Sequence, residues 1–322
     1  MNNKIKKSVL YVAQTFALLG LSQAAQAQEA NHAAQAATSR KEVIHIKSAR
    51  FAAPLLEKWI AEYTAANPSV QFVVADKNAK QDEVDINLVI SDFAKGDVPV
   101  KPFSLAVGRY VVLPFAGKNN ALLDELQKKK LNERRLKELF FEKDAFDDDY
   151  DPEDKDKYHA TVYSGNSPAS IASIFAGHFG NPLSGLRGKK IAGDEIYLIN
   201  AVQKDKTGVS FNYLNYLYDI NSRQLKSDIA LLPLDLKREY SDILSEANLD
   251  KTIALLESKT IDIIPIEEFA FTSSNNKLTP KVQQFLAWVL SEGQAYNHQF
   301  GLLRLDEKTE RQELMAYHLK KE

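Results

Sequence analysis

Short apolar runs alternate with stretches of helical periodicity along most of this chain. Residues 43–46, 70–74 and 85–90 are runs of strand length, and residues 51–63 carry apolar side chains at helical spacing. Strands separated by helices favour parallel pairing with right-handed crossovers. The pattern therefore predicts an α/β fold.

The same alternation continues toward the C-terminus. It predicts further strands at residues 189–192, 208–213 and 228–233. It also predicts helices at residues 121–129, 133–140, 194–202, 249–258 and 280–292, followed by a charged terminal helix.

Residues 158–180 combine a strand, a polar turn and a helix in one stretch. The strand surrounds Thr161, the turn is Ser164-Gly165-Asn166, and the helix is predicted to begin with Ser167 as N-cap and Pro168 at its first position. Free N–H groups and the helix dipole at such an N-terminus favour an anion. The stretch is therefore either an anion site or an ordinary strand-turn-helix connection.

The first residues have the pattern of a secretory signal peptide. Three early lysines precede an apolar segment at residues 8–21, and Ala25-Gln26-Ala27 is a small-x-small cleavage site. Residues 1–27 are the predicted signal peptide, and residues 28–40 a flexible leader. The chain has no cysteine, so it lacks a lipid-anchor site. The mature protein is expected to be soluble, periplasmic and not lipid-anchored.

Charge and motifs narrow the functional classes. The 41 basic and 43 acidic residues give a net charge of −2, or −2 − 3 = −5 without the signal peptide, so no nucleic-acid partner is expected. The sequence has no nucleophile elbow, P-loop or H-E-x-x-H motif, and its histidines lack ligand spacing. We therefore predict no enzyme activity, catalytic residue, cofactor or metal ligand.

Residues 142–157 are unusually rich in aspartate. A calcium loop needs a glycine at its sharp turn and a closing glutamate. With Asp147 as the first ligand, Pro152 takes the turn position and Tyr158 the closing one. The stretch is therefore predicted to be a solvated loop that binds no structural calcium.

Four stretches carry a family resemblance: residues 51–68, 85–92, 136–140 and 281–303. Together they resemble the phosphate-binding component of bacterial phosphate importers, a branch of the type II periplasmic binding proteins. The resemblance spans most of residues 43–305 and implies two α/β domains with a ligand cleft between them.

The implied domains are discontinuous in sequence. Two long apolar segments, residues 105–115 and 261–266, would carry the chain from one domain to the other. The first domain would comprise residues 41–108 with 266–322, and the second residues 109–265.

The resemblance also implies a set of ligand-binding residues that converge between the domains: Ser48, Arg50, Asp92, Ser164, Asn166, Ser167 and Ser170. Arg50 replaces a hydroxyl residue of the family and adds a cation, and Asp92 stands at the position that accepts a proton from the ligand. The family's Ser-Gly-Thr turn is replaced at Ser167, which removes one N–H donor and one hydroxyl.

Three hypotheses follow from these residues. The first is a periplasmic solute-binding protein that takes phosphate or another small anion and delivers it to the permease of an ABC transporter. The second is a sensor or adaptor that keeps the fold, has lost phosphate binding and acts through another periplasmic or membrane protein. The third is an exported enzyme on this fold.

Overall fold

The computed structural model describes residues 42–76, 78–90, 103–142, 157–168, 170–274 and 278–319. The predicted signal peptide and leader, Asp92, and residues 143–156 of the acidic stretch lie outside these ranges. Within them, no helix combines the length and the apolar character that crossing a bilayer requires.

Nine strands form one mixed sheet in the order β2-β1-β3-β11-β4-β7-β5-β6, with β10 paired to β4. The strands are β1 (Glu42–Ser48), β2 (Val70–Val74), β3 (Ile86–Ile90), β4 (Phe103–Gly117), β5 (Thr161–Gly165), β6 (Lys189–Ile191), β7 (Gly208–Tyr213), β10 (Ile229–Leu231) and β11 (Ile266–Ser273), and a separate pair is β8 (Tyr218–Asp219) with β9 (Gln224–Leu225). β1 runs parallel to β2 and β3, and β5 runs parallel to β6 and β7, as the alternating pattern predicts.

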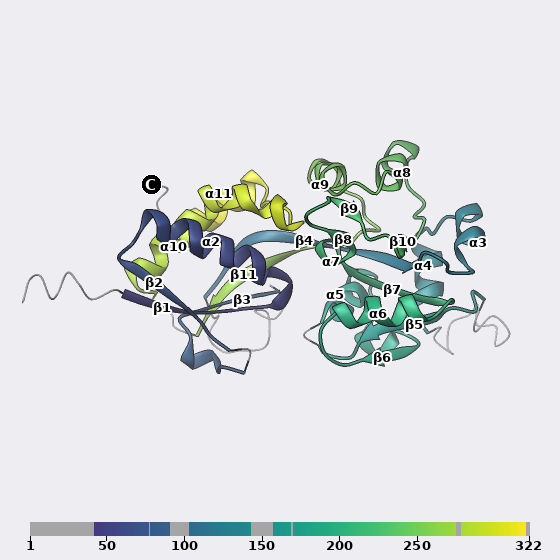
Figure 1. Ribbon diagram of the computed structural model, residues 1–322, viewed down its shortest axis with the longest axis horizontal. Coiled ribbons are helices and arrows are strands. Elements are labelled where there is room, and N and C mark those ends of the chain that lie inside the picture. Colours follow the sequence, from purple (N-terminus) through teal and green to yellow (C-terminus); the bar gives the residue numbers. More distant parts are fainter. Residues whose placement is uncertain are drawn as a thin grey trace, which may run out of the picture.

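The helices lie around this sheet in two groups (Figure 1). The α-helices are α2 (Ala53–Ala66), α3 (Leu123–Lys128), α4 (Glu133–Phe140), α5 (Ile171–His178), α6 (Ile196–Lys204), α7 (Leu214–Leu217), α8 (Arg238–Ser245), α9 (Leu249–Ser258), α10 (Pro280–Leu290) and α11 (Glu307–Ala316). Short 3-10 helices are η1 (Arg50–Ala52), η2 (Gln81–Glu83), η5 (Leu183–Gly185) and η6 (Glu292–Phe300).

The molecule has two lobes joined by β4 and β11 (Figure 1). The first lobe holds β1 to β3, α2, α10, η6 and α11, and the second holds α3 to α9 with β5 to β10. β4 pairs with β11 and then with β7, so the sheet passes from one lobe into the other along a single strand. This path agrees with the predicted passage at residues 105–115, while the domain limits themselves stay a prediction.

Packing explains why these segments form these elements. From Leu105 to Gly117 β4 is buried at every position except Arg109, because the strand has covered faces in both lobes. In α2, Leu55, Trp59 and Tyr63 face the sheet at helical spacing, and the Trp59 indole N–H donates to the Gly293 carbonyl at 2.8 Å. The helices predicted at residues 133–140 and 249–258 match α4 and α9.

One local prediction needs correction. The helix after β5 begins at Ile171 and has Ser170 as its N-cap, so Ser167 as N-cap is wrong. Ser170 donates both its N–H and its hydroxyl to the Ser167 carbonyl, and these bonds close a turn that delays the helix by one turn. Residues 261–266, the second predicted passage, contain a turn and lead into β11, which begins at Ile266; their role as a passage between domains stays a prediction.

Candidate site between the lobes

The end of β1 brings an arginine to the second lobe. The chain leaves β1 at Ser48, and the Ala49 N–H donates to the Leu88 carbonyl at 2.7 Å, which fixes the turn before η1. Nε of Arg50 then lies 3.1 Å from Oδ2 of Asp194, which precedes α6. The Arg50 side chain is 63% exposed and that of Asp194 is 10% exposed, so this ion pair remains accessible from its arginine side.

Phe51 extends the same contact with an aromatic cluster. Its ring stacks on Tyr213 of the second lobe, with centroids 4.5 Å apart, and meets Tyr110 and Phe269 edge-on. Nδ2 of Asn215 donates to the Phe51 carbonyl at 2.8 Å. We call the residues Arg50, Phe51, Asp194, Tyr213 and Asn215 the lobe contact, because each of them bridges the two lobes.

A second carboxylate lies beside this contact. Oε1 of Glu195 accepts a long hydrogen bond, 3.4 Å, from the N–H of Ile171, the first residue of α5. Burial, reinforced by the charge of Asp194, raises the pKa of Glu195 above its ordinary 4.5. The helix N-terminus at which an anion was predicted therefore already faces a carboxyl group of the protein itself.

The nearby tyrosines stay neutral. Burial raises the pKa of Tyr213, and the carboxylates of Glu195 and Asp194 add to this effect. Burial and the same two carboxylates also raise the pKa of Tyr216. Both phenols can therefore act only as hydrogen-bond donors or acceptors, not as bases.

The predicted site residues have different environments. Ser48 donates its hydroxyl to the adjacent Ala49 carbonyl at 2.9 Å, whereas Asn166 and Ser167 are exposed. Ser164 is fully buried, and its hydroxyl accepts a hydrogen bond from Nζ of Lys190 at 3.0 Å. Ser170 is buried and bonded within its own turn. Arg50 is thus the predicted residue with a direct contact to the opposite lobe, and Asp92 lies outside the described residues.

The sequence interpretation missed the two carboxylates. Asp194 entered the sequence analysis only as the first residue of the helix predicted at residues 194–202; in the structure it precedes the N-cap Glu195, and its carboxylate accepts the Ile196 N–H at 2.9 Å. Asp194 and Glu195 both follow the parallel strand β6 and open a helix, which is where ligands of open α/β sheets bind. That position was the signal that could have identified them.

The site contains no evident catalytic group. Its described charged groups are one guanidinium and two carboxyl groups, without a nucleophile hydrogen-bonded to a base. Among the described residues, no three His, Cys, Asp or Glu side chains are grouped so that they could hold a metal ion. The arrangement can bind and neutralise charge between the lobes.

Comparisons with known proteins agree with this architecture. No family model matches the sequence, and no curated protein is a significant match. Among solved structures, the chain is similar to a candidate phosphate ABC transporter substrate-binding protein from Clostridium perfringens, solved with bound phosphate, at 14% identity and TM-score 0.55, covering 82% of this chain and 100% of that one.

Two further similarities are weaker. An ABC-type phosphate transport receptor from Vibrio cholerae has 10% identity and TM-score 0.48, with 81% and 100% of the two chains covered. The regulatory domain of CrgA, a LysR-type transcriptional regulator from Neisseria meningitidis, has 13% identity and TM-score 0.42, with 78% and 98% covered.

The first similarity shows the fold. The chain has the α/β architecture, with a mixed sheet, of type II periplasmic binding proteins over most of its length. At 14% identity the match carries no information on the ligand of this chain.

Proposed function

We propose that this protein is an exported, non-enzymatic binding protein that holds a small anion, phosphate or a similar one, between its lobes at Arg50. The observation that carries the proposal is the Arg50–Asp194 pair, in which a guanidinium of the first lobe holds a carboxylate of the second at 3.1 Å. A guanidinium that binds a carboxylate presents the same fork of donors to phosphate. Because the Arg50 side chain is 63% exposed, a dissolved anion can reach it.

Asp194 then competes with the ligand for Arg50. In the described conformation Arg50 is neutralised by Asp194, and Glu195 adds a second carboxyl group nearby. An incoming anion must therefore displace Asp194, which happens when the lobes separate. Asp92 remains our proposed acceptor for the proton of a ligand such as hydrogen phosphate, so it would discriminate against sulfate.

The test removes the competitor. Asp194→Asn keeps the shape of the side chain but removes its charge, so Arg50 becomes available and repulsion of the ligand falls. We expect phosphate to bind Asp194→Asn about fivefold more tightly than the wild type, since an exposed ion pair is worth up to about 1 kcal/mol. Isothermal titration calorimetry at pH 7 with phosphate, sulfate and acetate measures this directly.

Two variants control the experiment. Asp250→Asn also takes a carboxylate away from an arginine, Arg223, but outside the lobe contact, and should leave phosphate affinity unchanged. Arg50→Ala should abolish binding in both the wild-type and the Asp194→Asn background. If neither the wild type nor Asp194→Asn binds any of the three anions, the anion proposal is wrong.

A second candidate function is the sensor or adaptor that has lost phosphate binding. The specific observation in its favour is that protein carboxyl groups already lie on Arg50 and on the α5 N-terminus. In that case the lobe contact keeps the two lobes together at all times, and small-angle scattering should show no change of shape when any anion is added. The permease of an ABC transporter suits the first candidate, and another periplasmic or membrane protein suits the second.

Export is part of both proposals and rests on the signal peptide pattern alone. N-terminal sequencing of the mature protein should start at or near Gln28. A mature chain that still begins with Met1 would remove the periplasmic location from the proposal.

A further inference from the structure

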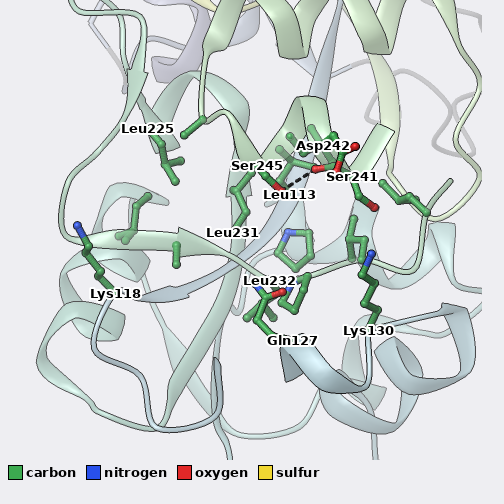
Figure 2. A pocket seen from close by; sticks show the side chains of 18 of the residues that line it. Leu113, Lys118, Gln127, Lys130, Leu225, Leu231, Leu232, Ser241, Asp242 and Ser245 are labelled. Carbon is green, nitrogen blue, oxygen red and sulfur yellow. Dashed lines mark hydrogen bonds between the residues drawn. The ribbon is translucent and has the colours of Figure 1, made fainter. Parts of the chain in front are cut away.

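The second lobe contains a pocket that the lobe contact does not use. Its volume is about 480 Å³, within the range of small-molecule sites. The paired strands β4 and β10 form its floor, and α8 lies over it (Figure 2). None of the residues of the lobe contact lines it.

Most of the residues that line the pocket are aliphatic, and the others are polar. Its apolar lining side chains in the described part of the chain are leucine, isoleucine, alanine and proline, for example Leu113, Leu225, Ile229, Leu231, Leu232 and Leu244. Such a surface, without aromatic rings, offers a flexible hydrocarbon chain many weak contacts and gives a planar ring nothing to stack on.

The covering helix leaves this space open. No residue of α8 is fully buried, so the helix does not pack tightly onto β10. Two small side chains, Ser241 and Ser245, face the pocket, and the Ser245 hydroxyl bonds to the Ser241 carbonyl at 2.7 Å.

The Ser241 hydroxyl is buried, and the described residues give it no hydrogen-bond partner. Buried hydroxyls almost always have a partner. Ser241 also lines the pocket, so the polar atoms of α8 lie directly behind its wall.

Three lysines lie around this apolar interior. Lys118 and Lys130 stand on opposite sides of the pocket in Figure 2, and Lys226 also lines it. Within the described ranges, none of the three is in an ion pair with a carboxylate. The one lining acid, Asp242, is exposed and lies 3.8 Å from Arg238.

Burial lowers the pKa of Lys226, although the carboxylates of Asp228 and Asp219 oppose this. Its ammonium is therefore incompletely solvated and would gain from an anionic partner. An aliphatic interior with unpaired cations at its edge favours a ligand that has both a hydrocarbon chain and a negative charge.

We propose that this pocket binds a free aliphatic carboxylate, with its chain against the leucines of β4, β10 and α8 and its carboxylate at the rim, where lysines on both sides favour a negative charge. The ligand is independent of the anion between the lobes, so the two proposals can fail separately.

Binding is tested with decanoate on the mature full chain. Calorimetry should show one site for decanoate and much weaker binding of decanol, which has the same chain without the charge. Acetate should not bind there, because it has no chain, and decylamine should be rejected by the lysines. Equal affinity for decanol and decanoate, or tighter binding of decylamine, would overturn the charge assignment and the proposal with it.

Two variants locate the site. Replacing both Lys118 and Lys130 with glutamate changes only rim side chains, and we expect it to weaken decanoate binding about tenfold or more. Lys129→Glu is the matched control, because Lys129 is an exposed lysine beside the pocket that does not line it; it should bind like the wild type. Unchanged decanoate affinity in Lys118→Glu/Lys130→Glu contradicts the proposal.

A pocket-filling variant and a spectrum complete the test. Ser241→Leu places a larger side chain in the cavity and should abolish binding, and should it fail to fold, the lysine variants still decide. In methyl NMR of leucine-labelled protein, decanoate should shift signals of Leu113, Leu231 and Leu244. Shifts confined to leucines elsewhere, such as Leu55 or Leu88, would place the ligand outside this pocket.

Discussion

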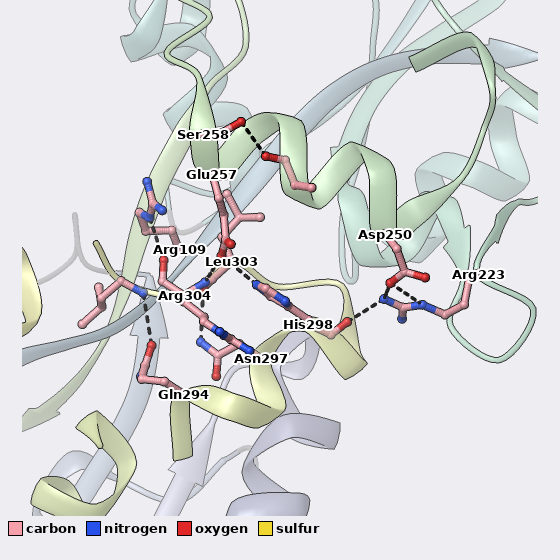
Figure 3. A network of polar contacts seen from close by, with 12 residues as sticks. Arg109, Arg223, Asp250, Glu257, Ser258, Gln294, Asn297, His298, Leu303 and Arg304 are labelled. Atoms are coloured by element: carbon pink, nitrogen blue, oxygen red, sulfur yellow. Dashed lines mark hydrogen bonds and ion pairs between the residues drawn. The ribbon is translucent and has the colours of Figure 1, made fainter. Parts of the chain in front are cut away.

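The two lobes contact each other on both faces of the β4–β11 pair, and the two contacts are made by different kinds of interaction. Successive side chains of a strand point to opposite faces. Tyr110 of β4 accordingly contacts Phe51 in the lobe contact, whereas the preceding Arg109 donates to the Arg304 carbonyl at 2.9 Å on the other face. Figure 3 shows the polar network around Arg109, which also includes Arg223, Asp250, Glu257 and His298. We call it the rear network.

The rear network has more polar bonds than the lobe contact. Arg223 of the second lobe donates to Oδ1 of Asp250 at 2.6 Å and to the carbonyls of His298 and Gln299 of the first lobe. Oε1 of Glu257 accepts two hydrogen bonds, one from Nε2 of the His298 ring at 2.8 Å and one from the Arg304 N–H at 2.7 Å. Burial opposes ionisation of Glu257, but these bonds hold its pKa below the ordinary value.

This difference indicates which side of the β4–β11 pair can open. Within the described part of the chain, the lobe contact is made by one ion pair with an exposed arginine and one amide hydrogen bond, together with the stacked ring of Phe51. The hydrogen bonds of the rear network involve backbone carbonyls and the half-buried side chains of His298 and Glu257. The geometry of these bonds tolerates little movement. We therefore expect the lobes to pivot about the rear network and to part at the lobe contact.

The largest expected effect comes from the aromatic part of the lobe contact. Phe51 is 3% exposed and touches rings from both lobes, so Phe51→Ala should lower the free energy of unfolding by about 3–5 kcal/mol. Denaturant unfolding should also split into two transitions, because the lobes lose the ring stack between Phe51 and Tyr213. Phe175→Ala removes an equally buried ring inside the second lobe and should keep a single transition. One cooperative transition in Phe51→Ala would show that the rear network alone couples the lobes.

The two arginines allow the comparison to be made directly. Arg223 is 21% exposed and has three acceptors among the described residues, whereas Arg50 is 63% exposed and has one there. Arg223→Ala should cost about 2 kcal/mol of stability, and Arg50→Ala less than about 1 kcal/mol. Arg50→Ala should nevertheless raise the open fraction more, as measured by energy transfer between dyes on the two lobes. Equal stability losses and equal opening would remove the proposed asymmetry.

Much of the fold could be predicted because it follows from the local spacing of apolar residues along the chain. The apolar periodicity that identified residues 133–140 and 249–258 depends on neighbours along the chain, and both became helices with those limits. α8 was missed although Tyr240, Ile243 and Leu244 have helical spacing and pack against the core, where none of them is fully buried.

The site was less predictable because its contacts are not local. Arg50 was selected through the family resemblance, as a cation in place of a hydroxyl residue, and the structure gives it a partner across the lobes. That partner, Asp194, lies in a remote part of the sequence, and no local period links the two residues. The capping serine was misplaced for a related reason, since the turn from Ser167 to Ser170 is set by hydrogen bonds that compete with the helix.

The smallest expected effect is a pH dependence of the unfolding free energy that arises at the strands beside the rear network. Glu313 of α11 has a buried Oε2 without a hydrogen-bond partner in the described residues, and burial, together with the charge of Glu268 on β11, raises its pKa to about 7. The folded protein therefore holds a proton on Glu313 that the unfolded chain releases near the ordinary value of 4.5, so this residue favours folding most at low pH. That contribution should disappear as the pH rises from about 4.5 to about 7.

Glu313→Gln stays neutral at every pH, and after allowance for partial exposure it should exceed the wild type in stability by about 1 kcal/mol at pH 8, with little difference at pH 4.5. Glu307→Gln on the same helix, whose side chain is 86% exposed, is the control and should show no such pH dependence. If the difference in unfolding free energy between wild type and Glu313→Gln is constant from pH 4.5 to 8, the pKa of Glu313 is the same in the folded and the unfolded protein, and the strands beside the rear network carry no pH-dependent weakness.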